Sequence, residues 1–334
     1  MKVLALFGQL KHNRVDNEQT RILSNALARD GKLYKREVFF NLLINLPNII
    51  LSILPIWLCV KHIDDFKDID DCDIIVASGK KMIRYAKHLR KNAFPNAKIV
   101  QIGNPYCSIG KNDVLLRQNT SKFIFSCKNT ITCRGLLCEK VSKEVADEEC
   151  KKYEKIKQAL NGDFIAVFIG GNKYFNMSQY EAKQFAMQID KISNSMQMPL
   201  LIVADMRVSK RIIEIIKNNL QCSYYFYSKA NNPKDSPKVA FMLFAGYYIV
   251  ADNSINDVSE YTSQGKPTYI FFSSKNSKRY RQFCEQLFSN MVAKCLVGDM
   301  EKLEYFVPNK LNDIEKIVNQ IKEIIAIDNK SNVK

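Results

Sequence analysis

The residues best suited to chemistry lie in the segment YYIVADNSINDVSEYTSQGKP, at positions 247–267. A strand is predicted to end at Asp252, and a helix follows at once with Ser254, Asn256 and Asp257 in its first turn. The free N–H groups of such a helix start carry partial positive charge. The pattern therefore indicates a place where a diphosphate can bind.

The same helix carries a carboxylate, Glu260, next to Ser259, one turn further from its start. A carboxylate in this position can accept hydrogen bonds from ribose hydroxyls, so both residues are candidates for nucleotide binding. Gly265 is predicted to end the helix. A plain strand–helix–strand unit with a glycine stop explains the same spacing without any ligand.

Two further loops follow predicted strands of the second half of the chain. Gly170 and Gly171, with Asn172 next, come directly after an apolar run, and glycines let a backbone approach a phosphate closely. Arg207 stands just before a helix that Ser209 is predicted to cap, where a guanidinium can bind a phosphate with two hydrogen bonds. A tight turn and a surface arginine are the simpler interpretations.

The first half of the chain offers candidates for a general base. The polar loop at residues 8–19 follows the first predicted strand and contains His12, Asp16 and Glu18. A surface histidine is the simpler interpretation of His12. The residues leave open which of the three side chains would take the proton.

Two more loops of the first half end predicted strands. Ser78, Gly79, Lys80 and Lys81 follow one strand and open a basic helix, and Asn104 follows another. Ligands of parallel sheets bind at the carboxyl ends of strands. These residues are therefore candidates for the phosphate or acceptor side of a site.

Short apolar runs alternate with amphipathic stretches throughout the chain, which predicts parallel sheets covered by helices on both faces. The pattern restarts after a polar stretch at 139–157, so we predict an α/β protein of two doubly wound, Rossmann-like domains. The first spans residues 1–150 and the second spans 151–310. Residues 311–334 form a C-terminal helix and tail, and the helix is expected to pack back onto the domains.

The chain has 334 residues and a net charge of +16, and its 10 cysteines show no zinc-type spacing. The excess charge is spread along the sequence, so no nucleic-acid partner and no metal are expected. The run from Lys80 to Lys98 is locally basic, which suits either an anionic partner or a solvated helix face.

Residues 38–60 are strongly apolar, but asparagines and the prolines Pro47 and Pro55 interrupt them. We interpret this segment as a surface element or ordinary core, because proline breaks a spanning helix. An element that dips into a membrane beside the basic run would favour an anionic lipid surface. The expected location is the cytoplasm, either free or peripheral on the inner face of the cytoplasmic membrane.

Taken together, the loop motifs resemble those of the plant mitochondrial-fission factor (elongated-mitochondria) family and its bacterial homologues. They are ASGKK at 77–81, IGG at 169–171, DMR at 205–207, NP at 232–233, ADNS at 251–254, SE at 259–260 and GKP at 265–267. The sequence departs from the family pattern at Lys80 and Lys81, which replace arginines, at Asn253, and in the weakened motif that ends at Arg207.

The resemblance implies a GT-B-like fold with a cleft between the domains. It implies a metal-independent glycosyltransferase that needs no cofactor and moves a sugar from a nucleotide-diphosphate sugar to a lipid or envelope-glycan acceptor. The second domain would bind the nucleotide, with Glu260 on the ribose, and the base would come from the loop of His12, Asp16 and Glu18. A nucleotide-sugar 2-epimerase and a non-enzymatic membrane adaptor are the alternatives.

Overall fold

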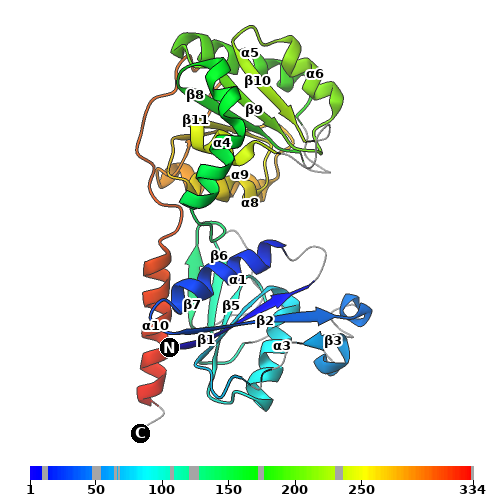
Figure 1. The fold of residues 1–334 in the computed structure, drawn as a ribbon, viewed down its shortest axis with the longest axis vertical. Coiled ribbons are helices and arrows are strands. Elements are labelled where there is room, and N and C mark those ends of the chain that lie inside the picture. Colours follow the sequence, from blue (N-terminus) through cyan, green and yellow to red (C-terminus); the bar gives the residue numbers. More distant parts are fainter. Residues whose placement is uncertain are drawn as a thin grey trace. The chain divides into compact units, whose positions relative to one another are not determined.

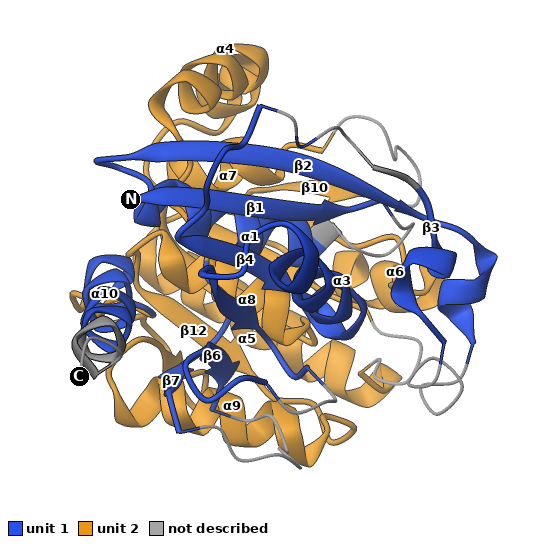
Figure 2. Cartoon of the chain, turned by 90° about the horizontal axis from the view of Figure 1, so that it is seen from below, with its two compact units in different colours: residues 1–137, 312–334 blue, residues 138–311 orange. Residues whose placement is uncertain are grey.

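The computed structural model describes residues 1–9, 14–46, 54–63, 66, 68–105, 109–119, 128–171, 177–229 and 236–331. The chain forms two compact units, coloured separately in Figure 2. Unit 1 comprises Met1–Leu137 and Asn312–Lys334, and unit 2 comprises Cys138–Leu311. The sequence places the division at residue 150. The cleft expected between the two domains stays a prediction.

Unit 1 is built on a seven-stranded sheet with the order β3-β2-β1-β4-β5-β6-β7. All neighbouring strands are parallel except β2 and β3, which pair antiparallel at one edge. The strands are β1 (Lys2–Gly8), β2 (Lys32–Phe40), β3 (Val60–Ile63), β4 (Ile74–Ser78), β5 (Lys98–Ile102), β6 (Val114–Gln118) and β7 (Thr130–Cys133). The apolar pattern of the sequence also predicts a strand at 122–126, a segment that lies outside the described residues.

Helices cover both faces of this sheet (Figure 1). One face packs against α3 (Gly79–Asn92), through Leu4 and Ile75 of the strands and Ile83 of the helix. The other face packs against α1 (Arg14–Leu27) and the C-terminal helix α10 (Ile314–Ser331), whose Ile317 and Ile321 are buried. The C-terminal helix thus packs back onto unit 1. Two short 3-10 turns, η1 (Leu42–Asn45) and η2 (Ile56–Cys59), connect β2 to β3.

Unit 2 contains a six-stranded, fully parallel sheet with the order β10-β9-β8-β11-β12-β13. Its strands are β8 (Phe164–Ile169), β9 (Leu200–Ala204), β10 (Tyr224–Ser228), β11 (Ala245–Ala251), β12 (Thr268–Phe271) and β13 (Lys294–Cys295). β8 reads FIAVFI and is buried along its whole length, as a parallel strand covered on both faces requires.

Six helices surround the sheet of unit 2: α4 (Lys143–Leu160), α5 (Gln179–Met196), α6 (Lys210–Asn218), α7 (Lys238–Phe244), α8 (Ile255–Ser263) and α9 (Lys278–Ser289). α5 and α6 pack on one face, and α4, α7, α8 and α9 pack on the other. The serines at 178, 209, 254 and 277 cap four of these helices, because each hydroxyl accepts a first-turn amide.

The strand orders confirm the predicted α/β fold of two doubly wound units. In such sheets the connections leave in opposite directions from one pair of neighbouring strands, and ligands bind at the carboxyl ends there. The pair is β1 and β4 in unit 1, and β8 and β11 in unit 2. None of the helices that the structure describes has both the length and the apolarity that crossing a membrane demands.

Candidate functional site

In unit 2 the two glycines after β8 bring three strand ends into close contact. A Cβ atom on Gly170 would lie 2.6 Å from the Asp252 carbonyl oxygen, and one on Gly171 would lie 2.7 Å from the Arg207 carbonyl carbon. The Gly170 N–H donates to Ala251 O at 2.8 Å, so this amide extends the sheet. The glycines therefore hold the loops after β8, β9 and β11 together. Asn172 lies outside the described residues.

The turn after β11 is fixed by buried polar groups. Asp252 is 3% exposed and adopts a left-handed backbone with φ +53°. Its Oδ1 accepts from Ser273 Oγ at 2.5 Å and from Asn276 Nδ2 at 3.1 Å. Burial raises the pKa of this carboxyl. Asn253 donates through Nδ2 to Phe168 O at 2.7 Å and to Ala251 O at 2.9 Å, which ties the turn to β8.

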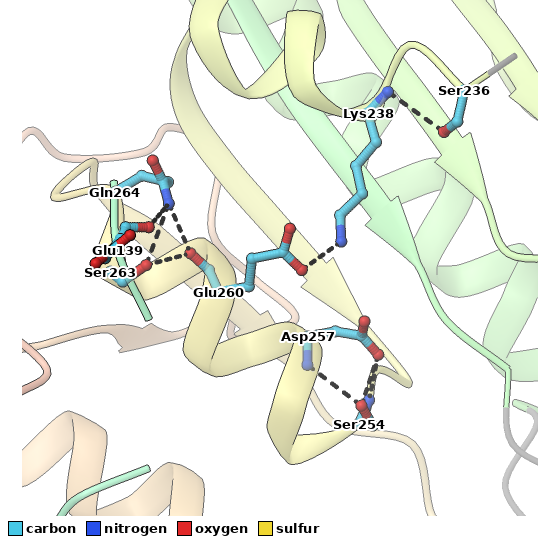
Figure 3. A network of polar contacts seen from close by, with 8 residues as sticks. All are labelled: Glu139, Ser236, Lys238, Ser254, Asp257, Glu260, Ser263 and Gln264. Atoms are coloured by element: carbon cyan, nitrogen blue, oxygen red, sulfur yellow. Dashed lines mark hydrogen bonds and ion pairs between the residues drawn. The ribbon is translucent and has the colours of Figure 1, made fainter. Parts of the chain in front are cut away.

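The start of α8 is closed by a capping box, as Figure 3 shows. Ser254 Oγ accepts from the Asp257 amide at 3.2 Å and donates to Asp257 Oδ2 at 2.6 Å. The amides of Ile255 and Asn256, between these two residues, have no acceptor within the helix. Ser254 thus positions the helix start, and the two amides after it are the groups that can meet an anion.

Glu260 forms an ion pair with Lys238 of α7 (Figure 3). Lys238 Nζ donates to Glu260 Oε2 at 2.6 Å, with the two side chains 25% and 41% exposed, and it also lies 4.8 Å from the Tyr261 ring centre. The predicted ribose ligand is therefore held in place by a cation and still reaches solvent. Ser259 differs, because it is fully buried and donates to Ile255 O at 2.7 Å within its own helix.

The carboxyl end of α8 is fixed as well. Gln264 Nε2 donates to the carbonyls of Glu139 and Glu260, each at 3.2 Å (Figure 3). Lys266 of the GKP motif donates through Nζ to Met242 O and Leu243 O at 2.8 Å, and also to Ala245 O. These carbonyls end α7. Lys266 thus fixes the helix that carries Lys238.

A hollow of about 510 Å³ opens where α5 and α6 begin. Its lining contains two helix caps, Ser178 and Ser209, and two cations, Arg211 and Lys275. Two helix N-termini and two positive side chains favour an anionic ligand. The sequence analysis missed Arg211 and Lys275. Arg207 comes two residues before Ser209 in the chain but is not part of this lining. Its side chain is exposed, and its Nε donates to Asp205 Oδ1 at 3.2 Å.

In unit 1 the predicted residues meet at the carboxyl ends of β1 and β4. Ser78 Oγ donates to Asp16 Oδ1 at 3.1 Å, and a Cβ atom on Gly79, where φ is +80°, would lie 2.8 Å from Asp16 Oδ2. Burial raises the pKa of the Asp16 carboxyl, and the hydrogen bond from Ser78 lowers it in part. Asn17 bonds both the N–H and the carbonyl of Gly8, at 2.9 and 3.0 Å, and so fixes the helix to the strand.

A buried amide supports this cluster from β5. Gln101 Nε2 donates to Gly79 O at 3.2 Å and to Ile102 O at 2.8 Å, whereas its buried Oε1 has no hydrogen-bond partner among the residues that the structure describes. The side chain therefore holds the loop that closes over Asp16. The sequence analysis missed Gln101, because an amide inside an apolar strand gives no local signal.

The other candidates of unit 1 lie around this cluster or apart from it. Glu18 is exposed and binds Arg21 at 2.6 Å, and His12 lies outside the described residues. Lys81 Nζ donates to Asn45 Oδ1 at 3.1 Å. Lys80 is exposed, and Asn104 is half-buried. Among the candidate bases that the structure describes, Asp16 is therefore the half-buried one, and burial raises its pKa.

The sequence model of a family described as Mitochondrial fission ELM1 matches residues 15–325. The chain belongs to this family. The protein RP120 of Rickettsia prowazekii (strain Madrid E), itself uncharacterized, is 29% identical over an alignment of 333 positions that covers 89% of this chain and 92% of RP120. The structure shows what several motifs of this ELM1 family member do: GG joins loops, and the lysine of GKP caps a helix.

Two solved structures share the fold of this ELM1 family member. A glycosyltransferase from Rickettsia africae ESF-5 superposes with a TM-score of 0.50 at 13% identity, over 98% of this chain and 88% of that one. The UDP-GlcNAc 2-epimerase from Methanocaldococcus jannaschii superposes with a TM-score of 0.56 at 10% identity, over 97% of this chain and 100% of that one. At these identities the likeness shows the fold alone, and it confirms a GT-B-like fold.

Proposed function

We propose that this chain is a glycosyltransferase that takes a sugar from a nucleotide-diphosphate sugar and passes it to a lipid or envelope-glycan acceptor. The observation that carries the proposal is the convergence of the loops after β8, β9 and β11, which Gly170 and Gly171 make possible. On the same edge of the sheet, helix starts and the cations Arg211 and Lys275 favour a diphosphate. Glu260, held by Lys238, is the proposed ribose ligand.

In this proposal unit 1 binds the acceptor, and Asp16 is the general base. Its carboxylate takes the proton of an acceptor hydroxyl, and the hydroxyl oxygen attacks the anomeric carbon of the sugar. The bond from that carbon to the phosphate oxygen breaks, and the nucleoside diphosphate leaves with the electron pair. A raised pKa makes Asp16 a stronger base than an exposed aspartate. The positive groups of unit 2 offset the charge on the leaving diphosphate.

The first test is a thermal-shift screen of the full chain against UDP-, GDP-, CMP- and dTDP-sugars. A donor that binds raises the melting temperature by mass action. No shift with any nucleotide would refute the proposal and favour a membrane adaptor. Product analysis with the donor so found then separates transfer to an acceptor from 2-epimerisation of the donor sugar.

Asp16→Asn tests the base while keeping the size of the side chain and its contacts with Ser78 and Gly79. We expect the turnover rate to fall by about 10²–10⁴-fold, which is the usual contribution of a positioned base. Donor affinity should stay unchanged, because Asp16 belongs to unit 1. The matched control is Glu18→Gln, which alters an exposed carboxylate of the same helix. If both variants turn over like the wild type, Asp16 is not the base.

A further inference from the structure

The turns η1 and η2 of unit 1 expose apolar side chains to solvent. Leu42 is 86% exposed and Trp57 is 59% exposed, and Leu43 and Leu58 next to them are exposed as well. The two turns contact each other, and the Asn41 side chain joins them by donating to Leu58 O at 2.6 Å. These four side chains therefore form one apolar tip on two connected turns.

The apolar tip is firmly attached to the body of unit 1. Ile44 of η1 and Ile56 and Cys59 of η2 are buried in the core that also contains α3. The Asn41 N–H donates to Cys59 O at 2.9 Å, next to the pairing of β2 with β3. The buried side chains of the turns thus anchor the turns to unit 1. The outer apolar side chains stay exposed and add nothing to this core.

Helix α3 places positive charge beside the apolar tip. Lys80, Arg84, Lys87 and Lys91 recur at helical spacing and share one side of α3. Arg84 Nη2 donates to Leu54 O at 2.8 Å, just before η2, so this side of the helix adjoins the turns. Lys81 reaches η1 through Asn45. Both acceptors are neutral, so neither of these two hydrogen bonds offsets the positive charge of Lys81 or Arg84.

An apolar tip flanked by cations fits the surface of an anionic membrane. Tryptophan and leucine enter the boundary between headgroups and acyl chains, and lysine and arginine attract anionic headgroups. A second copy of the chain fits less well, because it would bring two equally basic helices together in a protein of net charge +16.

We propose that unit 1 docks on anionic lipid by inserting Leu42, Leu43, Trp57 and Leu58, with the basic side of α3 on the headgroups. The docking does not depend on the proposed sugar transfer. Its position does bear on that function, because β1, β2 and β4 are parallel and η1 follows the carboxyl end of β2. The tip therefore extends from the edge of the sheet that carries Asp16 and Ser78, which suits an acceptor held in the membrane.

Trp57 is the only tryptophan of the chain, so its fluorescence reports directly on the tip. The full chain is titrated, without nucleotide, with phosphatidylcholine vesicles that contain or lack phosphatidylglycerol. With the anionic vesicles we expect a blue shift, protection from an aqueous quencher and co-sedimentation, all weakening as salt is added. No shift with anionic vesicles, or an equal response to neutral ones, would overturn the proposal.

Leu42→Gln tests the apolar part while keeping Trp57 as the reporter. Because a fully buried leucine contributes about 1.5–3 kcal/mol, we expect at least about tenfold weaker binding to anionic vesicles. The double change Lys87→Gln and Lys91→Gln should weaken binding by about fivefold per lysine. Both variants should melt close to the wild type, because Leu42 and Lys91 are exposed and Lys87 is only half-buried.

The matched control is Val307→Gln, which removes another strongly exposed apolar side chain, from unit 2, and should bind vesicles like the wild type. If Val307→Gln weakens binding as much as Leu42→Gln, or if Leu42→Gln binds normally, the tip is not the docking surface. Asp16→Asn, by contrast, should bind vesicles normally while losing sugar transfer. Failure of docking and failure of the proposed activity are therefore distinguishable.

Discussion

Gly170→Ala gives a direct test of how the loops that form the proposed nucleotide site of unit 2 are held together. The new Cβ would stand 2.6 Å from both the Asp252 carbonyl oxygen and Asn253 Cα, whereas carbon atoms normally rest 3.5–4.0 Å apart. The backbone after β11 must therefore move by about 1 Å. That turn cannot adapt easily, because Asp252 is already left-handed and Asn253 is bonded to both β8 and β11.

The magnitude follows from two effects. Overfilling a packed region costs about 1–3 kcal/mol, and losing one hydrogen bond of Asn253 costs about 0.5–1.5 kcal/mol more. A total of about 1.5–4.5 kcal/mol lowers the melting temperature of a unit of this size by about 3–18 °C. The start of α8 moves with the turn, so donor affinity should fall too.

We would measure the melting temperatures of Gly170→Ala and of the control Gly246→Ala by calorimetry. A Cβ on Gly246 would meet its nearest atom, Met198 Cε, at 3.9 Å, which is ordinary contact. We expect Gly246→Ala to melt at or slightly above the wild-type temperature, because alanine reduces the entropy of the unfolded chain. If Gly170→Ala melts like Gly246→Ala, the glycine is not required for the approach of the loops, and this account of the site is wrong.

Two further variants test single carboxylates of unit 2. Burial alone would raise the pKa of Glu181, but hydrogen bonds from the Ser178 and Ser274 amides lower it to about 2 from an ordinary 4.5. A carboxyl whose pKa is lowered by folding stabilises the folded state at pH values above its ordinary pKa. This stabilisation is lost as the pH falls from about 4.5 to about 2, so the melting temperature of Glu181→Gln should fall less steeply over that range than the melting temperature of the wild type. An equally steep fall in the variant would contradict this. Glu260→Gln should weaken donor binding about ten- to a hundredfold in a titration and leave the melting temperature nearly unchanged, because exposed ion pairs stabilise little. Normal affinity with a lower melting temperature would make Glu260 structural.

The sequence predicts the fold well where each segment carries its own signal. β8 is a continuous apolar run of buried residues, and the serines at 178, 209, 254 and 277 mark helix starts that the structure confirms. β3, β6, β7 and β13 lie outside every strand that the sequence pattern predicts. They are short, and β7 is a four-residue edge strand with little apolar pattern of its own.

The site is less predictable, because its contacts join residues that are distant in the sequence. Ser78 and Asp16 are 62 positions apart, and Lys238 and Glu260 are 22 apart. Local pattern shows that each of these side chains is polar, but it does not identify the partner. Two motif residues also use their polar groups within the fold and not toward a ligand. The Gly170 amide donates within the sheet, and Lys266 donates to carbonyls at the end of a helix.

Each unit has a carboxylate near the carboxyl ends of its two central strands, β1 and β4 in unit 1 and β8 and β11 in unit 2, and the differences between the two carboxylates support separate roles. Asp16 lies in the first turn of α1, after β1, and accepts a hydrogen bond from Ser78 at the end of β4. Asp252 follows β11 and accepts hydrogen bonds from Ser273 and Asn276 after β12, and it is almost completely buried. Burial raises the pKa of both carboxyls. Asp16 is half-buried, whereas Asp252 is 3% exposed and fixes the turn from which α8 begins. The proton transfer we propose therefore belongs to unit 1, and unit 2 supplies a rigid frame for the donor.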